Sequence, residues 1–284
     1  MPEVSVIIPT YNRSGSVVRA VQSVLDQSFK DLEIIVVDDG STDDTEGRLV
    51  PCGASIKYMR QPTNRGVSAA RNKGIENSSG TWIAFLDSDD YWLKEKLHVQ
   101  MEFLSQAPDA VACQTEEIWI RRGRRVNPKE IHKKPSGEIF QRSLRLCLVS
   151  PSSVILKRSV FDEVGLFDET LEAAEDYDLW LRISCRYPVY LIDREFVVKE
   201  GGHEGQLSRK HTGMDRFRVK ALAKLINSGV LSADQEAAAL EELAVKCTIY
   251  GNGCIKRGRQ EEGYFYLSLP ERIKEEGKIS LNQV

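Results

Sequence analysis

Three largely apolar runs near the N-terminus end abruptly in polar residues, and this pattern restricts the fold that the chain can adopt. They cover residues 4–8, 34–37 and 82–86, and residues with helical spacing, such as 17–25, lie between them. Strands that are apolar on both faces and alternate with amphipathic helices are typical of a mostly parallel sheet that helices cover on both sides. We therefore expect an α/β fold in which ligands bind beyond the carboxyl ends of the strands.

The third run ends on three carboxylates, those of Asp87, Asp89 and Asp90. Unpaired charges at a buried strand end are costly, whereas a hard divalent cation needs oxygen ligands of this kind. The alternative is that these residues cap the next helix, and for Asp90 we expect only that role. The first two runs end on residues 9–12 and on Asp38 and Asp39, so we expect one polar rim and favour an active site there.

Composition excludes several classes of protein. The 284 residues carry a net charge of -3 with a pI of about 5.9, which gives no global basic field for nucleic acid. The six cysteines include no Cys-x-x-Cys pair, which favours reduced thiols in the cytoplasm over a zinc site or disulfides. No signal peptide begins the sequence, and no apolar run reaches the roughly 18 residues of a membrane span.

One segment is locally basic: residues 121–125 hold four arginines, with Lys129, Lys133 and Lys134 beyond it. It is either a solvated loop or a contact for an anionic acceptor, a phospholipid surface or a nucleotide phosphate. We therefore leave open a cytoplasmic protein that touches the inner face of a membrane.

The later part of the chain changes in character. Residues 93–105 predict a helix, residues 110–120 a long strand or strand pair, and residues 189–192 the last strand of the core. From about residue 213 apolar residues keep helical spacing, which predicts an appendage of two to four helices. Packing is its default role, and dimerisation is a further option.

Four sequence blocks resemble family 2 glycosyltransferases, which are inverting enzymes of the GT-A fold with nucleotide-sugar donors. The blocks are residues 5–13, 37–45, 64–72 and 85–90, and they occur in the order that the family shows. The resemblance extends from residue 4 to about 212. It implies a GT-A type, Rossmann-like sheet domain at 1–212, with a donor-binding half at 1–106 and an acceptor-binding half at 107–212. Residues 213–284 would be the helical appendage.

The residues at the first two strand ends suit a nucleotide. Tyr11 can stack a flat base on its ring, or it is only a rim aromatic with its hydroxyl in water. Asp39 can accept a hydrogen bond from the N–H of a uracil or thymine ring, whereas one of Asp38 and Asp39 is expected only to form the turn. Arg71 contacts base or phosphate, or is an ordinary surface arginine. The resemblance implies these donor contacts: Pro9, Tyr11, Arg13, Asp39, Arg71 and Asp87.

The segment from Asp87 to Asp89 resembles the Asp-x-Asp motif of the family. The resemblance implies that Asp89 binds Mg²⁺ or Mn²⁺ and that Asp87 reaches the ribose or shares the metal. His203, in a glycine-rich stretch, is a candidate for a further metal or diphosphate contact, and Arg209 and Lys210 for phosphate contacts.

Residues 174–180 resemble the Glu-Asp block where the family places its catalytic base. We assign the base to Asp176, with Glu175 and Asp178 as competitors, since three acids fall within four residues. The alternative is that acids at a helix start only complement the helix dipole.

These observations predict a metal-dependent inverting glycosyltransferase. It would move a sugar from a UDP- or dTDP-linked donor to a hydroxyl of a glycan or lipid-linked acceptor, in bacterial polysaccharide, lipopolysaccharide or glycoconjugate assembly. A non-catalytic nucleotide-sugar-binding or scaffold protein is the alternative. A sugar-1-phosphate nucleotidyltransferase and a dinucleotide-binding dehydrogenase are weaker, because residues 9–12 stand where a glycine-rich phosphate loop would be needed.

Overall fold

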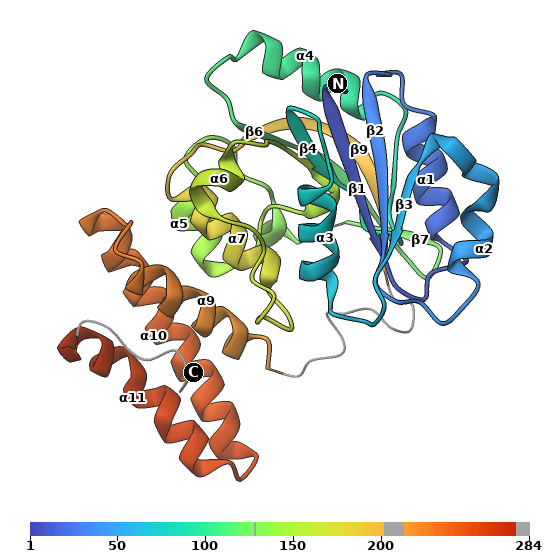
Figure 1. The fold of residues 1–284 in the computed structure, drawn as a ribbon. Helices are drawn as coiled ribbons and strands as arrows, with labels where there is room; N and C mark the ends of the chain where they lie inside the picture. Colours follow the sequence, from blue (N-terminus) through green and yellow to red (C-terminus); the bar gives the residue numbers. More distant parts are fainter. Residues whose placement is uncertain (128, 202–212, 277–284) are drawn as a thin grey trace. The chain divides into compact units, whose positions relative to one another are not determined.

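The computed structural model describes residues 1–127, 129–201 and 213–276 (Figure 1). Contacts within the chain divide it into two compact units. The sheet unit contains residues 1–138 and 148–169 and the described residues from 187 to 201; the helical unit contains residues 139–147, 170–186 and 213–276. The expected division near residue 212 stays a prediction, and the contacts group residues 139–147 and 170–186 with the C-terminal helices.

The sheet unit is built on one mixed, mainly parallel sheet, as the sequence predicts for its first half. Among the described residues its strand order is β3-β2-β1-β4-β8-β6-β9-β5, with β7 paired to β6. Strands β1, β2, β3 and β4 are parallel, and β8 lies antiparallel between β4 and β6. The bounds are β1 Val4–Thr10, β2 Leu32–Asp38, β3 Lys57–Arg60, β4 Trp82–Phe85, β5 Tyr91–Trp92, β6 Ala112–Arg121, β7 Arg124–Val126, β8 Val154–Lys157 and β9 Tyr190–Gly201.

Helices cover both faces of the parallel strands because side chains of β1 alternate between two cores. Val4, Val6 and Ile8 pack with residues of α1 and α4, whereas α3 covers the opposite face. A Cβ on Gly74 of α3 would lie 2.4 Å from Cγ2 of Ile7, so glycine lets α3 approach the sheet closely. The helices of this unit are α1 Val17–Leu25, α2 Thr45–Leu49, α3 Val67–Glu76, α4 Lys96–Gln106 and α6 Val160–Val164, with 3-10 turns at Val50–Ser55, Glu130–His132 and Pro151–Ser153.

Two local expectations need correction. Asp90 is not a helix cap: α4 begins at Lys96 after Glu95, and the Asp90 side chain is buried. The last strand, β9, extends to Gly201, because its pairing with β6 continues well beyond residue 192.

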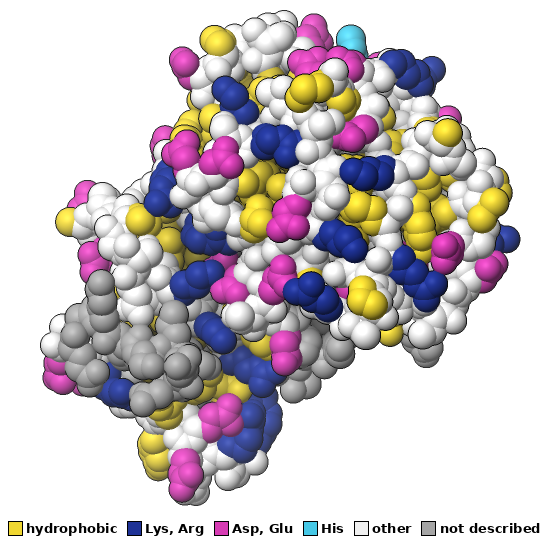
Figure 2. All heavy atoms as spheres, viewed as in Figure 1, with side chains coloured by type: hydrophobic (Ala, Val, Ile, Leu, Met, Phe, Trp, Pro, Cys, Tyr) yellow, Lys and Arg dark blue, Asp and Glu magenta, His cyan; other side chains and the backbone are white. Residues whose placement is uncertain are grey.

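The basic segment forms the β6–β7 hairpin, in which Arg122 and Gly123 both adopt positive φ, 51° and 73°. Exposed arginines occupy this turn, but Lys134 is buried and paired with Glu117. On the face in Figure 2, basic and acidic side chains are interspersed over the sheet unit. The charge on that face is therefore mixed rather than of one sign.

The helical unit has a core of its own, and the expected C-terminal helices are present. Tyr177 and Leu181 of α7 pack with Leu222 of α9 and Leu243 of α10, and the Tyr177 hydroxyl donates to the carbonyl of Leu144. None of the helices in the described ranges is both long and apolar enough to span a membrane. The helices are α5 Phe140–Arg145, α7 Glu175–Ser184, α9 Asp215–Asn227, α10 Ala233–Lys256 and α11 Gln260–Glu276.

Candidate active site

The polar ends of β1, β2 and β4 lie side by side at one edge of the sheet. β1 is the middle strand of the three: Thr10 pairs with Asp38 of β2, and Ile7 pairs with Phe85 of β4. Because the three strands are parallel, their carboxyl ends meet at this edge, which we call the rim. The rim brings together the residues after β1, Asp39 and the segment from Asp87 to Asp90.

The loop after β1 is tied to the loop after β2, and this leaves Tyr11 at the surface. Asn12 has φ of 50°, its backbone N–H donates to Ser41 Oγ at 2.8 Å, and its Oδ1 accepts from the Thr42 N–H at 2.7 Å. The Tyr11 side chain is 42% exposed. A ring held by a fixed backbone with an open face suits stacking on a flat base.

The structure separates the roles of two adjacent aspartates. Asp38 is buried and accepts from the backbone N–H of Ser41 at 2.7 Å and from the Tyr58 hydroxyl at 2.7 Å, so its carboxylate forms the turn. Asp39 is also buried, and it draws in the segment that leads into α3. Its Oδ1 accepts from Gln61 and from the Arg65 N–H, and its Oδ2 accepts from the Gly66 N–H at 2.8 Å.

The Asp39 carboxylate therefore holds the rim together and keeps capacity for one more donor. A carboxylate has about four acceptor sites, and three are used here, so Oδ2 can accept a further N–H. Burial raises the pKa of Asp39, although these three hydrogen bonds act in the opposite direction.

Arg71 lies under the rim and contacts Asp87. Its guanidinium donates to Asp87 Oδ1 at 2.8 Å and lies over the ring of Phe167, 5.1 Å from the centroid. The Arg71 side chain is 4% exposed and the Asp87 side chain 27%. The interpretation of Arg71 as an ordinary surface arginine is therefore wrong, because burial and pairing fix it below the rim.

Asp87 to Asp90 form a tight turn that Ser152 anchors. The N–H of Asp90 donates to the carbonyl of Asp87 at 2.9 Å. The Ser152 hydroxyl accepts from the Asp87 N–H at 3.1 Å and donates to Asp90 Oδ2 at 2.7 Å. Burial raises the pKa of Asp90 well above its ordinary value, whereas the charge of Lys199 lowers it. Sequence reasoning missed Ser152, since 62 residues separate it from Asp90.

We predict that Ser152→Ala loosens this turn. The substitution removes the acceptor for the Asp87 N–H and the donor to a buried carboxylate, and an unsatisfied buried group costs about 1–3 kcal/mol. Nucleotide binding in the presence of Mn²⁺ should weaken several-fold in calorimetry. Ser105→Ala, at an exposed hydroxyl of α4, is the control and should leave binding unchanged. Equal affinities for both variants would contradict the anchoring role.

The turn offers oxygen ligands for a cation but no closed cage. Among the described residues no group of three or more His, Cys, Asp or Glu side chains could hold a metal ion. Asp87 shares Oδ1 with Arg71, and Asp89 is partly exposed on the turn. Mg²⁺ is often held by one or two carboxylates together with substrate phosphates and water, so this pair of aspartates fits such an ion.

The helical unit carries the three candidate bases at the start of α7. The N-cap residue Ala174 has φ of 61°, an uncommon conformation for a residue with a Cβ. Glu175 is buried, and Asp178 is 2% exposed and paired with Arg182 at 2.6 Å and with Lys224 at 3.2 Å. Asp176 is partly exposed, and its Oδ1 accepts from the Tyr177 N–H at 2.7 Å. Of these three acids only Asp176 keeps a carboxylate open to solvent.

Three other predicted site residues lie outside the described residues: His203, Arg209 and Lys210. Pro9 is buried in β1, where it pairs with Val37 of β2. The Arg13 N–H donates to Thr45 Oγ1 at 3.3 Å, which holds the backbone beside Tyr11.

The sheet and its helices have the GT-A type of fold, and comparison with known proteins identifies the family. The model of glycosyl transferase family 2 matches residues 5–165, which is more than half of the chain. The chain therefore belongs to this family.

Curated relatives carry names of the same class. The chain is 32% identical over 242 residues to the UDP-Glc:alpha-D-GlcNAc-diphosphoundecaprenol beta-1,3-glucosyltransferase WfaP of Escherichia coli, covering 80% of this chain and 91% of the relative. It is 32% identical over 187 residues to the putative teichuronic acid biosynthesis glycosyltransferase TuaG of Bacillus subtilis, covering 64% and 72%. An uncharacterized glycosyltransferase of Rickettsia conorii is 35% identical over 196 residues, which cover 68% of this chain. The matched region spans only 32% of the length of that relative.

Solved structures support the fold. The crystal structure of S. aureus TarS in complex with UDP has a TM-score of 0.68 at 23% identity, covering 87% of this chain and 71% of that one. The mannosyltransferase PcManGT from Pyrobaculum calidifontis, solved with GDP-Man and Mn²⁺, has a TM-score of 0.62 at 17% identity, covering 98% and 88%. At these identities the likeness establishes the GT-A fold and nothing finer.

Proposed function

We propose that the protein transfers a sugar from a UDP- or dTDP-linked donor to a hydroxyl group with inversion at the anomeric carbon, and that the reaction depends on Mg²⁺ or Mn²⁺. The observation that carries this proposal is the rim, where Tyr11, Asp39 and the pair of buried Arg71 with partly exposed Asp87 lie at the ends of neighbouring strands. Side chains of this chemistry suit a base, a ribose and a diphosphate.

Each rim residue has a proposed task toward the donor. Tyr11 stacks on the base, and Asp39 Oδ2 accepts from the ring N–H of uracil or thymine. Arg71 orients Asp87 toward the ribose and adds positive charge below the diphosphate. Asp89, with Asp87, would hold a divalent cation, which would stabilise the negative charge that builds on the departing nucleoside diphosphate.

Asp176 is the proposed base. Its partly exposed carboxylate takes the proton from the acceptor hydroxyl as that oxygen attacks the anomeric carbon opposite the diphosphate. The oxygen–carbon bond forms while the bond to the diphosphate breaks, and the proton stays on Asp176 until product leaves. The pairing of Asp178 with two cations supports this assignment, since that carboxylate is already neutralised.

The acceptor is proposed from the relatives. WfaP is named for a diphosphoundecaprenol-linked acceptor and TuaG, putatively, for teichuronic acid biosynthesis. We propose a glycan or lipid-linked acceptor in bacterial polysaccharide or glycoconjugate assembly. A cytoplasmic location, contact of the basic hairpin with a membrane, and dimerisation through the helical appendage stay predictions.

Thermal unfolding with nucleotides tests the donor assignment. A ligand at a hundred times its Kd stabilises the native state by about 2.7 kcal/mol, so UDP or dTDP with Mn²⁺ should raise Tm clearly. CDP should have a much smaller effect, because the cytosine ring nitrogen N3 is an acceptor and offers no ring N–H to Asp39. Asp89→Asn should remove the Mn²⁺-dependent part of the shift and leave the fold intact.

Two outcomes would contradict the proposal. One is a Tm that no pyrimidine nucleotide raises at millimolar concentration. The other is an Mn²⁺ response that is the same in Asp89→Asn as in the unmodified protein.

A further inference from the structure

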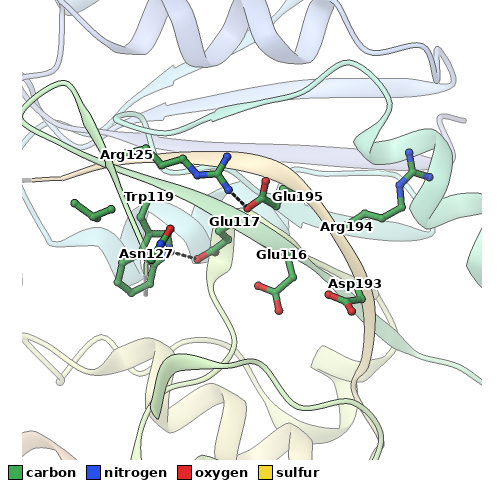
Figure 3. A pocket seen from close by; sticks show the side chains of 9 residues that line it. Glu116, Glu117, Trp119, Arg125, Asn127, Asp193, Arg194 and Glu195 are labelled. Atoms are coloured by element: carbon green, nitrogen blue, oxygen red, sulfur yellow. Dashed lines mark hydrogen bonds and ion pairs between the residues drawn. The ribbon is translucent and has the colours of Figure 1, made fainter. Parts of the chain in front are cut away.

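A polar pocket lies in the sheet unit, between β6, β7 and the middle of β9 (Figure 3). Its volume is about 330 Å³, which is enough for a single sugar ring. Its lining shares no residue with the rim contacts proposed for the donor.

The pocket is formed where the pairing of β6 with β9 is irregular. Thr115 pairs with Ile192, but the next residue, Glu116, pairs with Glu195, so that Asp193 and Arg194 bulge out of the ladder. Bulges re-aim side chains and occur often beside active sites. Here the bulge adds Asp193 and Arg194 to the wall of the pocket.

Carboxylates from both strands converge on this space. Glu116 and Glu117 of β6 and Asp193 of β9 line the same pocket. Burial raises the pKa of Glu116, the charge of Lys134 opposes this rise, and the carboxylates of Glu117 and Asp193 add to it. Among the described residues, these three carboxylates do not form a group that could hold a metal ion. Separated acceptors of this kind suit a ligand with several hydroxyl donors.

The other lining groups complete a saccharide-type surface. The Trp119 indole N–H donates to Glu117 Oε2 at 3.0 Å, which fixes the partly exposed ring at the pocket wall. Arg125 is paired with Glu195 across the pocket (Figure 3). An aromatic face with fixed carboxylates can pack on the C–H face of a sugar ring and accept from its hydroxyls.

We propose that this pocket binds a neutral saccharide ring of the acceptor; the inference rests on the proposed transferase function. Of the four carboxylates in the lining, Glu117 is paired with buried Lys134 and Glu195 with Arg125, which leaves Glu116 and Asp193 beside Arg194. The lining therefore offers no excess positive charge to a phosphate or nucleotide, whereas neighbouring hydroxyls of an uncharged polyol can donate to two carboxylates at once.

Lys199 of β9 connects the pocket strand to the segment that anchors the Asp87–Asp90 turn. Its ammonium donates to Ser150 Oγ at 3.1 Å, two residues before Ser152, whose hydroxyl accepts from the Asp87 N–H. β6 also runs parallel to β4, with β8 antiparallel between them, so Glu116 and Glu117 extend toward the rim side of the sheet. A saccharide here would lie on the side where the donor is expected.

Saturation-transfer NMR on the full chain tests the pocket without relying on turnover. The probes are methyl α-glucoside and methyl N-acetyl-α-glucosaminide, with glucose 1-phosphate as the anionic comparison. We expect signals from at least one methyl glycoside and none from the phosphate. Glu116→Gln and Asp193→Asn should each lower the glycoside affinity at least fivefold, whereas Glu102→Gln, an exposed glutamate of α4, should leave it unchanged.

The outcomes separate this inference from the proposed function. Absence of glycoside signals at about 50 mM glycoside, a concentration that fills even a site of millimolar Kd, would overturn the pocket. Signals that are equal in Glu116→Gln and in the unmodified protein would also overturn it. UDP binding by the same samples reports the donor site. If UDP binds and the glycosides do not, only the pocket fails; if the glycosides bind and UDP does not, the donor proposal fails.

Discussion

Replacement of Asp176 by asparagine is expected to lower kcat for sugar transfer by about 100- to 10,000-fold, the range that a general base contributes. The amide has nearly the same shape but cannot take the acceptor proton. The Kd for UDP should stay within about twofold, because the proposed general base acts on the acceptor hydroxyl and does not contribute to binding of the nucleotide alone. Transfer is measured by nucleotide release with acceptor, and donor binding by calorimetry.

A matched control addresses the helix-dipole alternative. Asp234→Asn makes the same change in the exposed first turn of α10, where the acid can only complement the dipole. Both variants should lose at most about 1 kcal/mol of stability from this effect, and Asp234→Asn should keep full activity. A variant of Asp176 that retains kcat, or one that loses most of its UDP affinity, would contradict the assignment.

The sequence could not choose among the three acids of α7, because the decisive contacts are not local. The neighbours of Asp178 include Lys224 of α9, 46 residues further along the chain. Helical spacing places Tyr177 and Leu181 in the core, but it does not say that a cation from another helix neutralises Asp178. The resemblance to the family selected Asp176, and the burial of Glu175 and Asp178 now supports that choice on physical grounds.

The same distinction between local and distant contacts explains the rest of the fold. β1, β2 and β4 follow from continuous apolar runs, and their polar ends follow from the parallel arrangement. The burial of Asp90 depends on Ser152, and the irregular pairing of β6 and β9 depends on residues far apart in sequence. Periodicity carries no information about either contact. The sequence therefore suggests a helix cap at Asp90 and does not indicate the pocket.

Replacement of Asp178 by alanine is expected to be the most destabilising single change in the acid-rich turn of α7. It would leave Arg182, whose side chain is 12% exposed, without its carboxylate partner at 2.6 Å, and Lys224 without its partner at 3.2 Å. Removing one member of a buried ion pair typically costs about 3–5 kcal/mol. Because the Lys224 side chain is 34% exposed, we expect a loss near the lower end of this range. The free energy of unfolding is measured in urea by far-ultraviolet circular dichroism.

The exposed pair of Glu46 and Arg60 provides the comparison, since its side chains are 57% and 49% exposed. Glu46→Ala should cost no more than about 1 kcal/mol. Asp178→Met with Arg182→Leu removes two charges of the network together and should recover part of the loss, because replacement of a buried pair by apolar groups is often close to neutral. A loss below about 1 kcal/mol for Asp178→Ala would show that the pair is dispensable. Asp178 would then again compete with Asp176 for the role of base, because burial and pairing were the grounds for setting it aside.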